Sequence, residues 1–207
     1  MNKIIAIDGP TASGKGTLAK KLAKHFNLPY LNTGGLYRSV ALKMMQDGKS
    51  SFSDKNEVIN ILKYVDFSDL ENPDLYTENV GNVASKVSVI QEVRDFLFQY
   101  QHNFAYQVGG SVLDGRDIGT VICPDASFKF FIVADVEERA RRRHKEMLEK
   151  GFKVDYNEIL SKLLARDKSD KERTNSPLKK ADGAIEVDTT KMDKDQVFEY
   201  VLSFIKF

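Results

Sequence analysis

Short apolar runs alternate with longer amphipathic segments along most of the chain. The apolar runs predict β-strands at Lys3–Ile7, Tyr30–Leu31, Ser111–Leu113, Lys129–Val133 and Ala184–Val187. Apolar residues at helical spacing predict helices at Gly14–Phe26, Leu36–Gln46, Gln91–Tyr106, Val136–Lys150, Tyr156–Asp167 and Asp193–Ile205. Strands that alternate with helices in this way are typical of an α/β fold with a parallel sheet.

Two regions interrupt this alternation. Residues 50–82 are polar and contain the turn signal Asn72-Pro73-Asp74, so we expect an insertion within residues 50–90 that helps to form a substrate site. Residues 167–180 are dense in charge and show no apolar face, so we expect an exposed, mobile stretch within a lid region at 150–180. The length of 207 residues fits a single domain, 1–207, that contains both regions.

The helix predicted at 91–106 carries one apolar stripe. Arg94 and Gln101 lie off this stripe. We interpret its aromatic residues as core residues and not as cofactor contacts. The stripe consists of Val93, Phe96, Leu97, Tyr100 and Phe104.

Composition excludes several classes of function. The 31 basic and 30 acidic residues are mixed along the chain, which argues against a large nucleic-acid surface. The only cysteine, Cys123, excludes an internal disulfide and is expected to be a buried core residue. The apolar run Ile4–Ile7 is too short for a signal peptide, and no apolar stretch approaches the length of a membrane span. We therefore expect a cytoplasmic protein with no membrane partner.

The most informative segment is a glycine-rich loop between the first predicted strand and the first predicted helix. Gly9 and Gly14 let the backbone curl with its N–H groups inward, and Lys15 adds a positive charge beside the helix N-terminus. This is the context of a phosphate-binding P-loop. Thr17 supplies the hydroxyl for Mg²⁺, one position later than in GTPases and motor ATPases. The predicted ATP-binding residues are Gly9, Pro10, Thr11, Ala12, Ser13, Gly14, Lys15, Gly16 and Thr17.

Arginine is scarce beside lysine, with 9 arginines against 22 lysines. Because guanidinium groups bind phosphate with two parallel hydrogen bonds, these arginines indicate a second anionic ligand besides ATP. Two loops carry the first candidates. After the second strand, Thr33 can cap the next helix and Arg38 follows in its first turn, where it is a phosphate-binding candidate or a merely exposed arginine.

The second loop, Leu113–Thr120, follows the third strand. Asp114 is placed like a carboxylate that holds Mg²⁺ through water, and Arg116 and Asp117 offer a phosphate-binding guanidinium beside a carboxylate acceptor. The alternative is a surface turn with a local ion pair. Both loops follow strand ends, which is where ligands bind in open α/β sheets.

Four arginines cluster at positions 139, 141, 142 and 143. Glu138 and Arg142 have i,i+4 helical spacing, so a solvated helix face explains part of this cluster. The functional interpretation is that one or two of these arginines reach the transferred phosphoryl group, with Arg142 as the catalytic candidate. An RNA-binding patch is disfavoured because no aromatic residues are interleaved there.

These residues favour transfer of a phosphoryl group to another phosphate. A phosphate acceptor is largely dianionic at neutral pH and needs no catalytic base. The difficulty lies in bringing two polyanions together, and lysine, arginine and Mg²⁺ reduce that repulsion. A lid over residues 150–180 would exclude water from the reaction.

The chain resembles the bacterial-type cytidylate kinases of the P-loop nucleoside-monophosphate kinase superfamily. The resemblance is carried in order by IDGPTASGKGT, TGGLYR, VASKVS, EVRDFL, LDGRDIGTV, EERARRR, RDKSDKER and VDTT. It implies a five-stranded parallel core, a nucleoside-monophosphate-binding insertion, a short lid, and phosphorylation of CMP and dCMP by ATP. It implies Mg²⁺ with ATP and no tightly bound prosthetic group. We expect a monomer.

The resemblance also implies roles for single residues. Lys15, Arg116 and Arg173 would act on the phosphates, and Arg38 would share the acceptor phosphate with Arg116. The cytosine would be read by Thr33, Arg94 and Asp117, and the sugar by Ser85, Arg166 and Asp170. Two features depart from the family pattern. Asn32 stands where many members carry aspartate, and the segment between Phe52 and Val80 is short, which argues against a full antiparallel subdomain.

Two alternatives remain open at this point. One is a kinase for another nucleoside monophosphate, such as AMP or UMP, because most of these residues bind only phosphate. The other is a P-loop ATPase or ATP-binding module that transfers nothing. Turnover with different acceptors separates them.

Overall fold

The computed structural model describes residues 3–48, 55–149 and 151–206 and forms two compact units. Unit 1 comprises Met1–Leu31 and Ala105–Phe207, and unit 2 comprises Asn32–Phe104. Residues 55–90 of the predicted insertion belong to unit 2, and residues 151–180 of the predicted lid region belong to unit 1. Residues 50–54 and 150, which these two predictions also include, lie outside the described residues.

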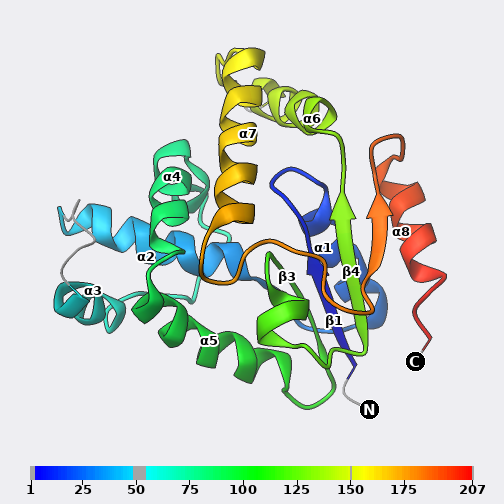
Figure 1. Cartoon of the computed structure of the whole chain (residues 1–207), viewed down its shortest axis with the longest axis horizontal. Coiled ribbons are helices and arrows are strands. Elements are labelled where there is room, and N and C mark those ends of the chain that lie inside the picture. Colours follow the sequence, from blue (N-terminus) through cyan, green and yellow to red (C-terminus); the bar gives the residue numbers. More distant parts are fainter. Residues whose placement is uncertain (1–2, 49–54, 150, 207) are drawn as a thin grey trace. The chain divides into compact units, whose positions relative to one another are not determined.

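Unit 1 is built on a five-stranded sheet with the order β2-β3-β1-β4-β5, in which β1 pairs in parallel with β3 and β4, and β4 in parallel with β5 (Figure 1). This confirms the predicted α/β fold with a parallel sheet. The strands are β1 Ile4–Asp8, β2 Tyr30–Asn32, β3 Ser111–Gly115, β4 Phe128–Val133 and β5 Ile185–Asp188.

The central strand β1 is buried on both faces, as its run of apolar residues predicts. Ile5 and Ile7 point to the same side and join a core cluster with residues of helices α1, Lys15–Phe26, and α8, Lys194–Leu202. β1 and β3 also contact η2, Ile118–Ile122, a turn of π-helix that follows β3. The strand β1, which leads into the glycine-rich loop, is therefore covered by helices α1 and α8 and also contacts η2.

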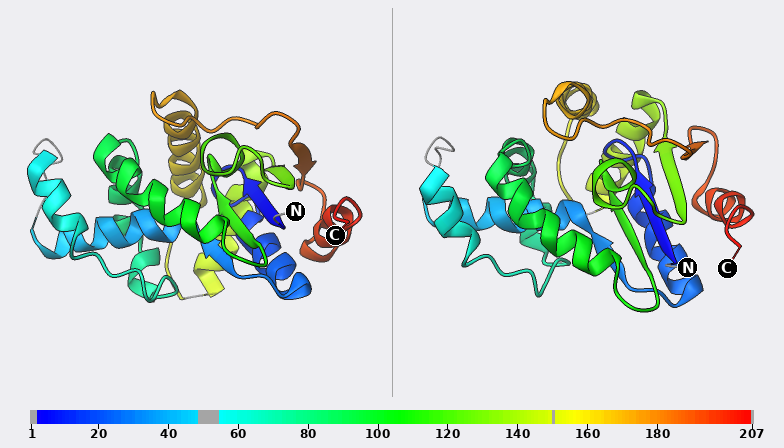
Figure 2. Two further views of the ribbon diagram at one scale, coloured as in Figure 1. Left: turned by 90° about the horizontal axis from the view of Figure 1, so that it is seen from below. Right: turned by 60° about the horizontal axis from the view of Figure 1, so that its bottom comes forward.

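Helices α6, Val136–Glu149, and α7, Tyr156–Glu172, pack against each other around Ala140, Ile159 and Leu163. The segment after α7 then crosses back to β5 (Figure 2). The structure corrects the expectation that residues 167–180 lack buried groups. α7 continues to Glu172, and Asp170 and Leu178 are both 5 % exposed. Directly before and within this extra helical turn, Asp167 and Asp170 form ion pairs with arginines from other parts of the chain. A search for apolar periodicity cannot detect such ion pairs.

After Asn32, the regular elements among the described residues of unit 2 are all helices, with a loop at residues 63–72. Helices α2 and α4 pack together, and η1 and α3 pack against α2. The polar segment 50–82 thus contains helices that the sequence pattern did not predict, although Val80, Ala84 and Val87 are buried at helical spacing. The elements are α2 Thr33–Gln46, α3 Lys55–Leu62, η1 Pro73–Tyr76, α4 Glu78–Val87 and α5 Gln91–Ala105.

The buried face of α5 differs from the predicted stripe. Val93 and Leu97 are fully buried as expected, but Phe96 and Tyr100 are 42 % and 39 % exposed. Their place in the buried face is taken by Arg94 and Gln101, which are 7 % and 1 % exposed. The prediction was wrong because polar groups can be buried when their hydrogen bonds are satisfied within the fold. Arg94 Nη1 donates to the Ser88 carbonyl, and Gln101 Nε2 donates to the Leu97 carbonyl, although Gln101 Oε1 has no hydrogen-bond partner among the described residues.

Two smaller expectations can be compared with the structure. Cys123 is fully buried, as predicted, and burial raises the pKa of its thiol to about 12. Among the helices that the structure describes, none has both the length and the apolar character needed to cross a membrane.

Candidate active site

The glycine-rich loop connects β1 to α1 through residues with unusual backbone angles. Ala12 and Gly14 have φ values of 62° and 89°. A Cβ atom at Gly9 would lie 2.2 Å from the Ile132 carbonyl oxygen, so only glycine fits there. α1 begins without a side-chain cap on its first N–H groups. Those N–H groups and the positive end of the helix dipole are suited to bind an anion, as the predicted P-loop requires.

Two polar groups of this loop fit a phosphate ligand. Ser13 Oγ is buried and makes no hydrogen bond to any residue that the structure describes. Such a buried hydroxyl is costly unless a ligand or water satisfies it. Lys15 Nζ donates to the Pro10 carbonyl at 3.4 Å. Burial is the main cause that lowers the pKa of Lys15 to about 7, and the positive charge of the nearby Arg116 contributes to the same shift. A bound phosphate would accept a hydrogen bond from the Ser13 hydroxyl and would favour the charged form of Lys15.

Asp114 lies at the carboxyl end of β3, beside the loop. It is 5 % exposed and accepts a hydrogen bond from the Tyr30 hydroxyl at 2.7 Å. A Cβ atom at Gly16 would lie 3.7 Å from Asp114 Oδ2, so this carboxylate adjoins the first turn of α1. A single carboxylate next to a phosphate site suits Mg²⁺, which usually keeps several waters and binds through one or two carboxylates plus substrate phosphates. Asp114 therefore has the chemistry that the predicted metal-binding role requires, while Thr17 lies exposed in the first turn of α1.

Arg116 joins three elements of unit 1. Its Nε donates to Asp170 Oδ2 of α7 at 2.8 Å, and its Nη2 donates to Thr11 Oγ1 of the P-loop at 2.7 Å. Burial alone would raise the pKa of Asp170, but the Arg116 ion pair and hydrogen bond outweigh it and hold that pKa below its usual value. Arg166 and Arg173 act in the same direction. Four predicted site residues, Arg116, Arg166, Asp170 and Arg173, are thus brought together by the fold.

Asp8 is a buried carboxylate that the sequence analysis did not single out. Its Oδ1 accepts from the backbone N–H of Ile118 at 2.9 Å, and its Oδ2 accepts from that of Gly119 at 2.8 Å. Burial raises the pKa of Asp8 to about 7 despite these two hydrogen bonds. Asp8 thereby fastens the end of β1 to η2, directly after Arg116 and the 5 % exposed Asp117. The one available signal was an acidic residue that ends an otherwise apolar strand.

The predicted acceptor residues of unit 2 gather around α4. Arg38 donates to the Leu75 carbonyl at 2.7 Å, lies over the Tyr76 ring at 5.4 Å, and approaches Gly81. Arg94 donates to the Ser88 carbonyl at 3.1 Å, directly after α4. Ser85 lies on α4 between these positions, and its carbonyl accepts from the Ser88 hydroxyl.

The start of α2 corrects one local prediction. Asn32, and not Thr33, is the N-cap residue, because Asn32 Oδ1 accepts the hydrogen bond of the Gly35 backbone N–H at 3.3 Å. Thr33 is instead the first residue of α2 and is 3 % exposed. Asn32 Nδ2 also donates to the Tyr76 hydroxyl at 3.1 Å.

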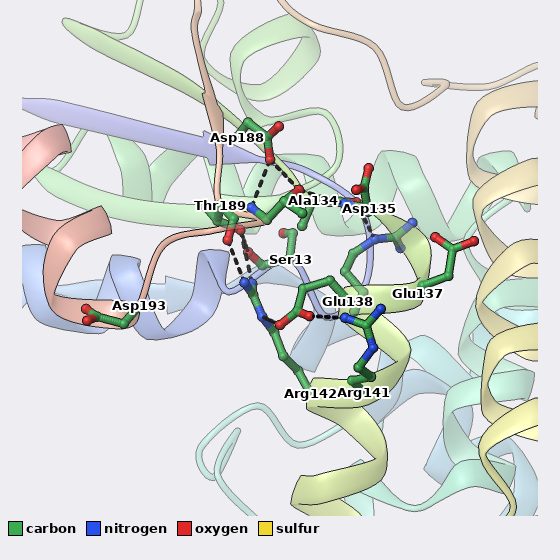
Figure 3. A network of polar contacts seen from close by, with 12 residues as sticks. Ser13, Ala134, Asp135, Glu137, Glu138, Arg141, Arg142, Asp188, Thr189 and Asp193 are labelled. Carbon is green, nitrogen blue, oxygen red and sulfur yellow. Dashed lines mark hydrogen bonds and ion pairs between the residues drawn. The ribbon is translucent and has the colours of Figure 1, made fainter.

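The arginine cluster of α6 splits into two kinds of residue. Arg141 and Arg143 pair with Glu138 and Glu146 on their own helix, which is the solvated-face arrangement. Arg139 is 4 % exposed and binds Asp167 of α7 in an ion pair, while Arg142 contacts Thr189 after β5 (Figure 3). The expected pair of Glu138 with Arg142 is present at 3.1 Å.

The central strand of this parallel sheet runs through the glycine-rich loop into a helix. Lysine lies at the loop, and a carboxylate lies at the end of the neighbouring strand. This arrangement is typical of P-loop nucleotide-binding proteins. Among solved structures, the chain is similar to an uncharacterized protein from Eubacterium ventriosum, with a TM-score of 0.57 and 20% identity over 99% of this chain and 98% of that one. A sugar kinase from Janibacter sp. matches with a TM-score of 0.51 and 12% identity over 99% and 94%. At these identities the likeness shows the fold alone.

Sequence comparison is more specific. A family model described as cytidylate kinase matches residues 5–207. The cytidylate kinases of Bartonella quintana and Methylocella silvestris are each 46% identical to this chain over 98% of its length and 94% of theirs. That of Rhodopseudomonas palustris is 47% identical over 92% and 89%. The chain therefore belongs to the cytidylate kinase family.

Proposed function

We propose that the chain transfers the γ-phosphoryl group of ATP to the phosphate of CMP or dCMP and yields CDP or dCDP. Family membership over nearly the full length supports this proposal. The observation that carries it is the contact between Arg116 and Thr11. A guanidinium assigned to the acceptor phosphate touches the loop assigned to the donor, which supports a direct transfer between the two phosphates.

The donor side is assigned to the P-loop, Gly9–Thr17. Its N–H groups and the N-terminus of α1 would hold the β- and γ-phosphates, and Lys15 would balance their charge. Asp114 and Thr17 would hold Mg²⁺, which neutralises phosphate charge when bound. No tightly bound prosthetic group is required.

The acceptor side is assigned to two sets of residues. Arg116 and Arg173 would stabilise charge that develops on the transferred group, and Arg38 would bind the acceptor phosphate with Arg116. We assign the cytosine to Thr33, Arg94 and Asp117, because its amino group needs an acceptor and its carbonyl needs a donor. We assign the sugar to Ser85, Arg166 and Asp170.

No general base is needed in this reaction. The acceptor phosphate has a second pKa near 6 and is already an anionic nucleophile at neutral pH. The residues therefore act by position and charge. Residues 150–180 would exclude water when both substrates are bound, which limits wasteful hydrolysis of ATP.

The test is a coupled assay of ADP release with MgATP and one acceptor at a time. We expect turnover with CMP and dCMP that exceeds turnover with UMP and AMP. A preference for AMP would reject the cytidine assignment. ATP binding without acceptor-dependent ADP release would instead indicate an ATP-binding module. We further propose that the protein is a monomer, that it is located in the cytoplasm, and that it has no nucleic-acid or membrane partner. Analytical sedimentation measures its oligomeric state.

A further inference from the structure

Two carbonyl oxygens of the P-loop accept hydrogen bonds from side chains outside the loop. The Thr11 carbonyl accepts from Arg139 Nη1 at 3.1 Å. The Ser13 carbonyl accepts from the Thr189 hydroxyl at 3.1 Å. Arg139 and Thr189 are 4 % and 2 % exposed; the hydrogen bond of Thr189 is buried, and that of Arg139 is partly buried.

The Thr189 hydroxyl is itself held by Arg142 (Figure 3). Arg142 Nη1 donates to Thr189 Oγ1 at 3.1 Å, and Nη2 donates to the Thr189 carbonyl at 2.5 Å. Because Arg142 occupies an acceptor position of the hydroxyl, the single hydroxyl proton is left for a carbonyl. The Val133 carbonyl lies within reach but already accepts the Thr189 backbone N–H at 2.8 Å. A carbonyl oxygen can accept two hydrogen bonds, so this proton is shared between the Ser13 carbonyl at 3.1 Å and the Val133 carbonyl at 3.2 Å, and only the first of these belongs to the P-loop.

Both sets of hydrogen bonds originate from one face of α6. Arg139 and Arg142 are three residues apart, which places them on neighbouring turns of the same face. Arg141 differs from these two residues in its exposure, since its side chain is 63 % exposed. Arg139 is fixed further by the Ala134 carbonyl at 2.9 Å and by the carboxylate of Asp167. The helix thus presents two anchored guanidinium groups toward the P-loop.

The orientation of these carbonyls bears on phosphate binding. A P-loop binds anions by turning successive N–H groups inward, and the intervening carbonyls then have to find donors elsewhere. Charged donors form stronger hydrogen bonds than neutral ones, so a guanidinium is well suited to hold a carbonyl in place. Fixing the Thr11 and Ser13 carbonyls also fixes the peptide planes that carry the adjacent N–H groups.

We propose that Arg139, Arg142 and Thr189 are positioning residues that keep the P-loop in its phosphate-binding shape. Arg139 acts directly on the Thr11 carbonyl, and Arg142 acts on the Ser13 carbonyl through Thr189. This inference rests on the ATP-binding part of the proposed function and is independent of the acceptor's identity. It gives Arg142 a role behind the loop, in place of direct contact with the transferred phosphoryl group.

Thr189 provides the sharpest test because it touches the loop without being a candidate for contact with phosphate. Thr189→Val removes the hydroxyl and keeps the shape of the side chain, while Thr189→Ser keeps the hydroxyl. ATP affinity is measured by calorimetry with Mg²⁺ and without any acceptor. We expect Thr189→Val to weaken ATP binding about fivefold, as for the loss of one hydrogen bond, and Thr189→Ser to stay within about twofold. The affinity for CMP should not change in either variant.

Arg142→Met and Arg141→Met form the matched pair on α6. Each removes one guanidinium from the same helix, but only Arg142 reaches Thr189. We expect Arg142→Met to weaken ATP binding by no more than the roughly fivefold loss of Thr189→Val, and Arg141→Met to leave it unchanged. Arg142→Met combined with Thr189→Val should be no worse than Thr189→Val alone, because Arg142 acts on the Ser13 carbonyl through Thr189. Circular dichroism confirms that each variant is folded.

Two outcomes would overturn the inference. If Arg142→Met lowers kcat with unchanged ATP affinity while Thr189→Val has no effect, Arg142 contacts the phosphoryl group directly. If Arg141→Met and Arg142→Met weaken ATP binding equally, α6 contributes only general positive charge. In either case the unchanged chain would still bind ATP and phosphorylate its acceptor, so the proposed function would stand. Absence of CMP turnover in the unchanged chain, with the expected order of ATP affinities, would reject only the proposed function.

Discussion

Arg116 Nε lies 2.8 Å from Asp170 Oδ2, which joins the loop after β3 to the last turns of α7. Asp170 is 5 % exposed, so this ion pair is largely removed from water. The same guanidinium reaches the Thr11 hydroxyl. The group that we assign to the acceptor phosphate is thus shared between the proposed lid region and the proposed donor loop.

The first prediction concerns Arg116→Lys. Lysine keeps the positive charge beside Asp170 but cannot bind a carboxylate and a phosphate with a planar fork. We expect kcat to fall about 100-fold, which is typical for loss of a group that stabilises transition-state charge. The melting temperature should change little. Arg141→Lys, at an exposed position on α6, is the control and should retain full activity. Unchanged turnover with a lower melting temperature would indicate a purely structural arginine.

The second prediction concerns Asp8→Asn, studied at pH 8, above the pKa of Asp8 at about 7. The two carboxylate oxygens accept one backbone N–H each. The side chain of asparagine has only one oxygen, so its NH₂ group would face one of these two N–H groups and leave it without an acceptor. We expect a loss of about 1–3 kcal/mol in the free energy of unfolding. kcat should fall as well, because Arg116 and Asp117 precede the segment that Asp8 holds. Urea unfolding and steady-state kinetics measure both effects, with the exposed Asp182→Asn as control. A stable Asp8→Asn variant with normal kinetics would contradict this role.

The third prediction concerns pH and Lys15. Its pKa is about 7 in the folded chain and 10.5 in the reference state, so between these values the unfolded chain binds more protons and stability rises with pH. Below pH 7 the buried charge destabilises the fold in full. We therefore expect Lys15→Met to raise the melting temperature at pH 6 without nucleotide, and the gain to shrink toward pH 9. ATP binding should be lost in the same variant.

Lys20→Met on the exposed side of α1 is the control for Lys15→Met. It should give a small difference in melting temperature that does not vary with pH. A gain for Lys15→Met that is constant from pH 6 to pH 9 would show that Lys15 is not desolvated as the structure indicates.

The fourth prediction concerns Asn32, the position that departs from the family pattern. Its side chain caps α2 and donates to the Tyr76 hydroxyl, which in turn donates to the Leu70 carbonyl at 2.8 Å. Aspartate can cap the helix but has no proton for Tyr76. We expect Asn32→Asp to lower the free energy of unfolding by about 1 kcal/mol. In a Tyr76→Phe background the same substitution should cost nothing. An equal cost in both backgrounds would show that the amide donor is irrelevant.

Local patterns predicted the framework of the fold well. The run Ile4–Ile7 was identified as a buried strand, and the loop Gly9–Thr17 as the connection to a helix, because both features are written in contiguous residues. Helix ends were less accurate. α7 continues beyond Asp167 to Glu172, and its buried Asp170 pairs with an arginine 54 residues earlier in the chain.

The apolar pattern was misleading where polar side chains replace apolar ones in a buried face. In α5 the fold buries Arg94 and Gln101 and leaves Phe96 partly exposed. Helical spacing cannot distinguish a guanidinium that finds a buried carbonyl from one that faces solvent. The same limit applied to α6, where four similar arginines range from the buried Arg139 to the exposed Arg141.

The amino-acid sequence by itself determined the strand, loop and helix that form the P-loop, because glycine conformations and apolar runs act within a few neighbouring residues. Family motifs also indicated a cytidylate kinase. Only the tertiary structure decided that Asp8 holds η2, that Arg116 lies between Thr11 and Asp170, and that Arg139 and Thr189 bind carbonyls of the loop. The partners in these contacts are brought together by sheet order and helix packing, and a hydrogen bond depends on distance in space and not on spacing in sequence.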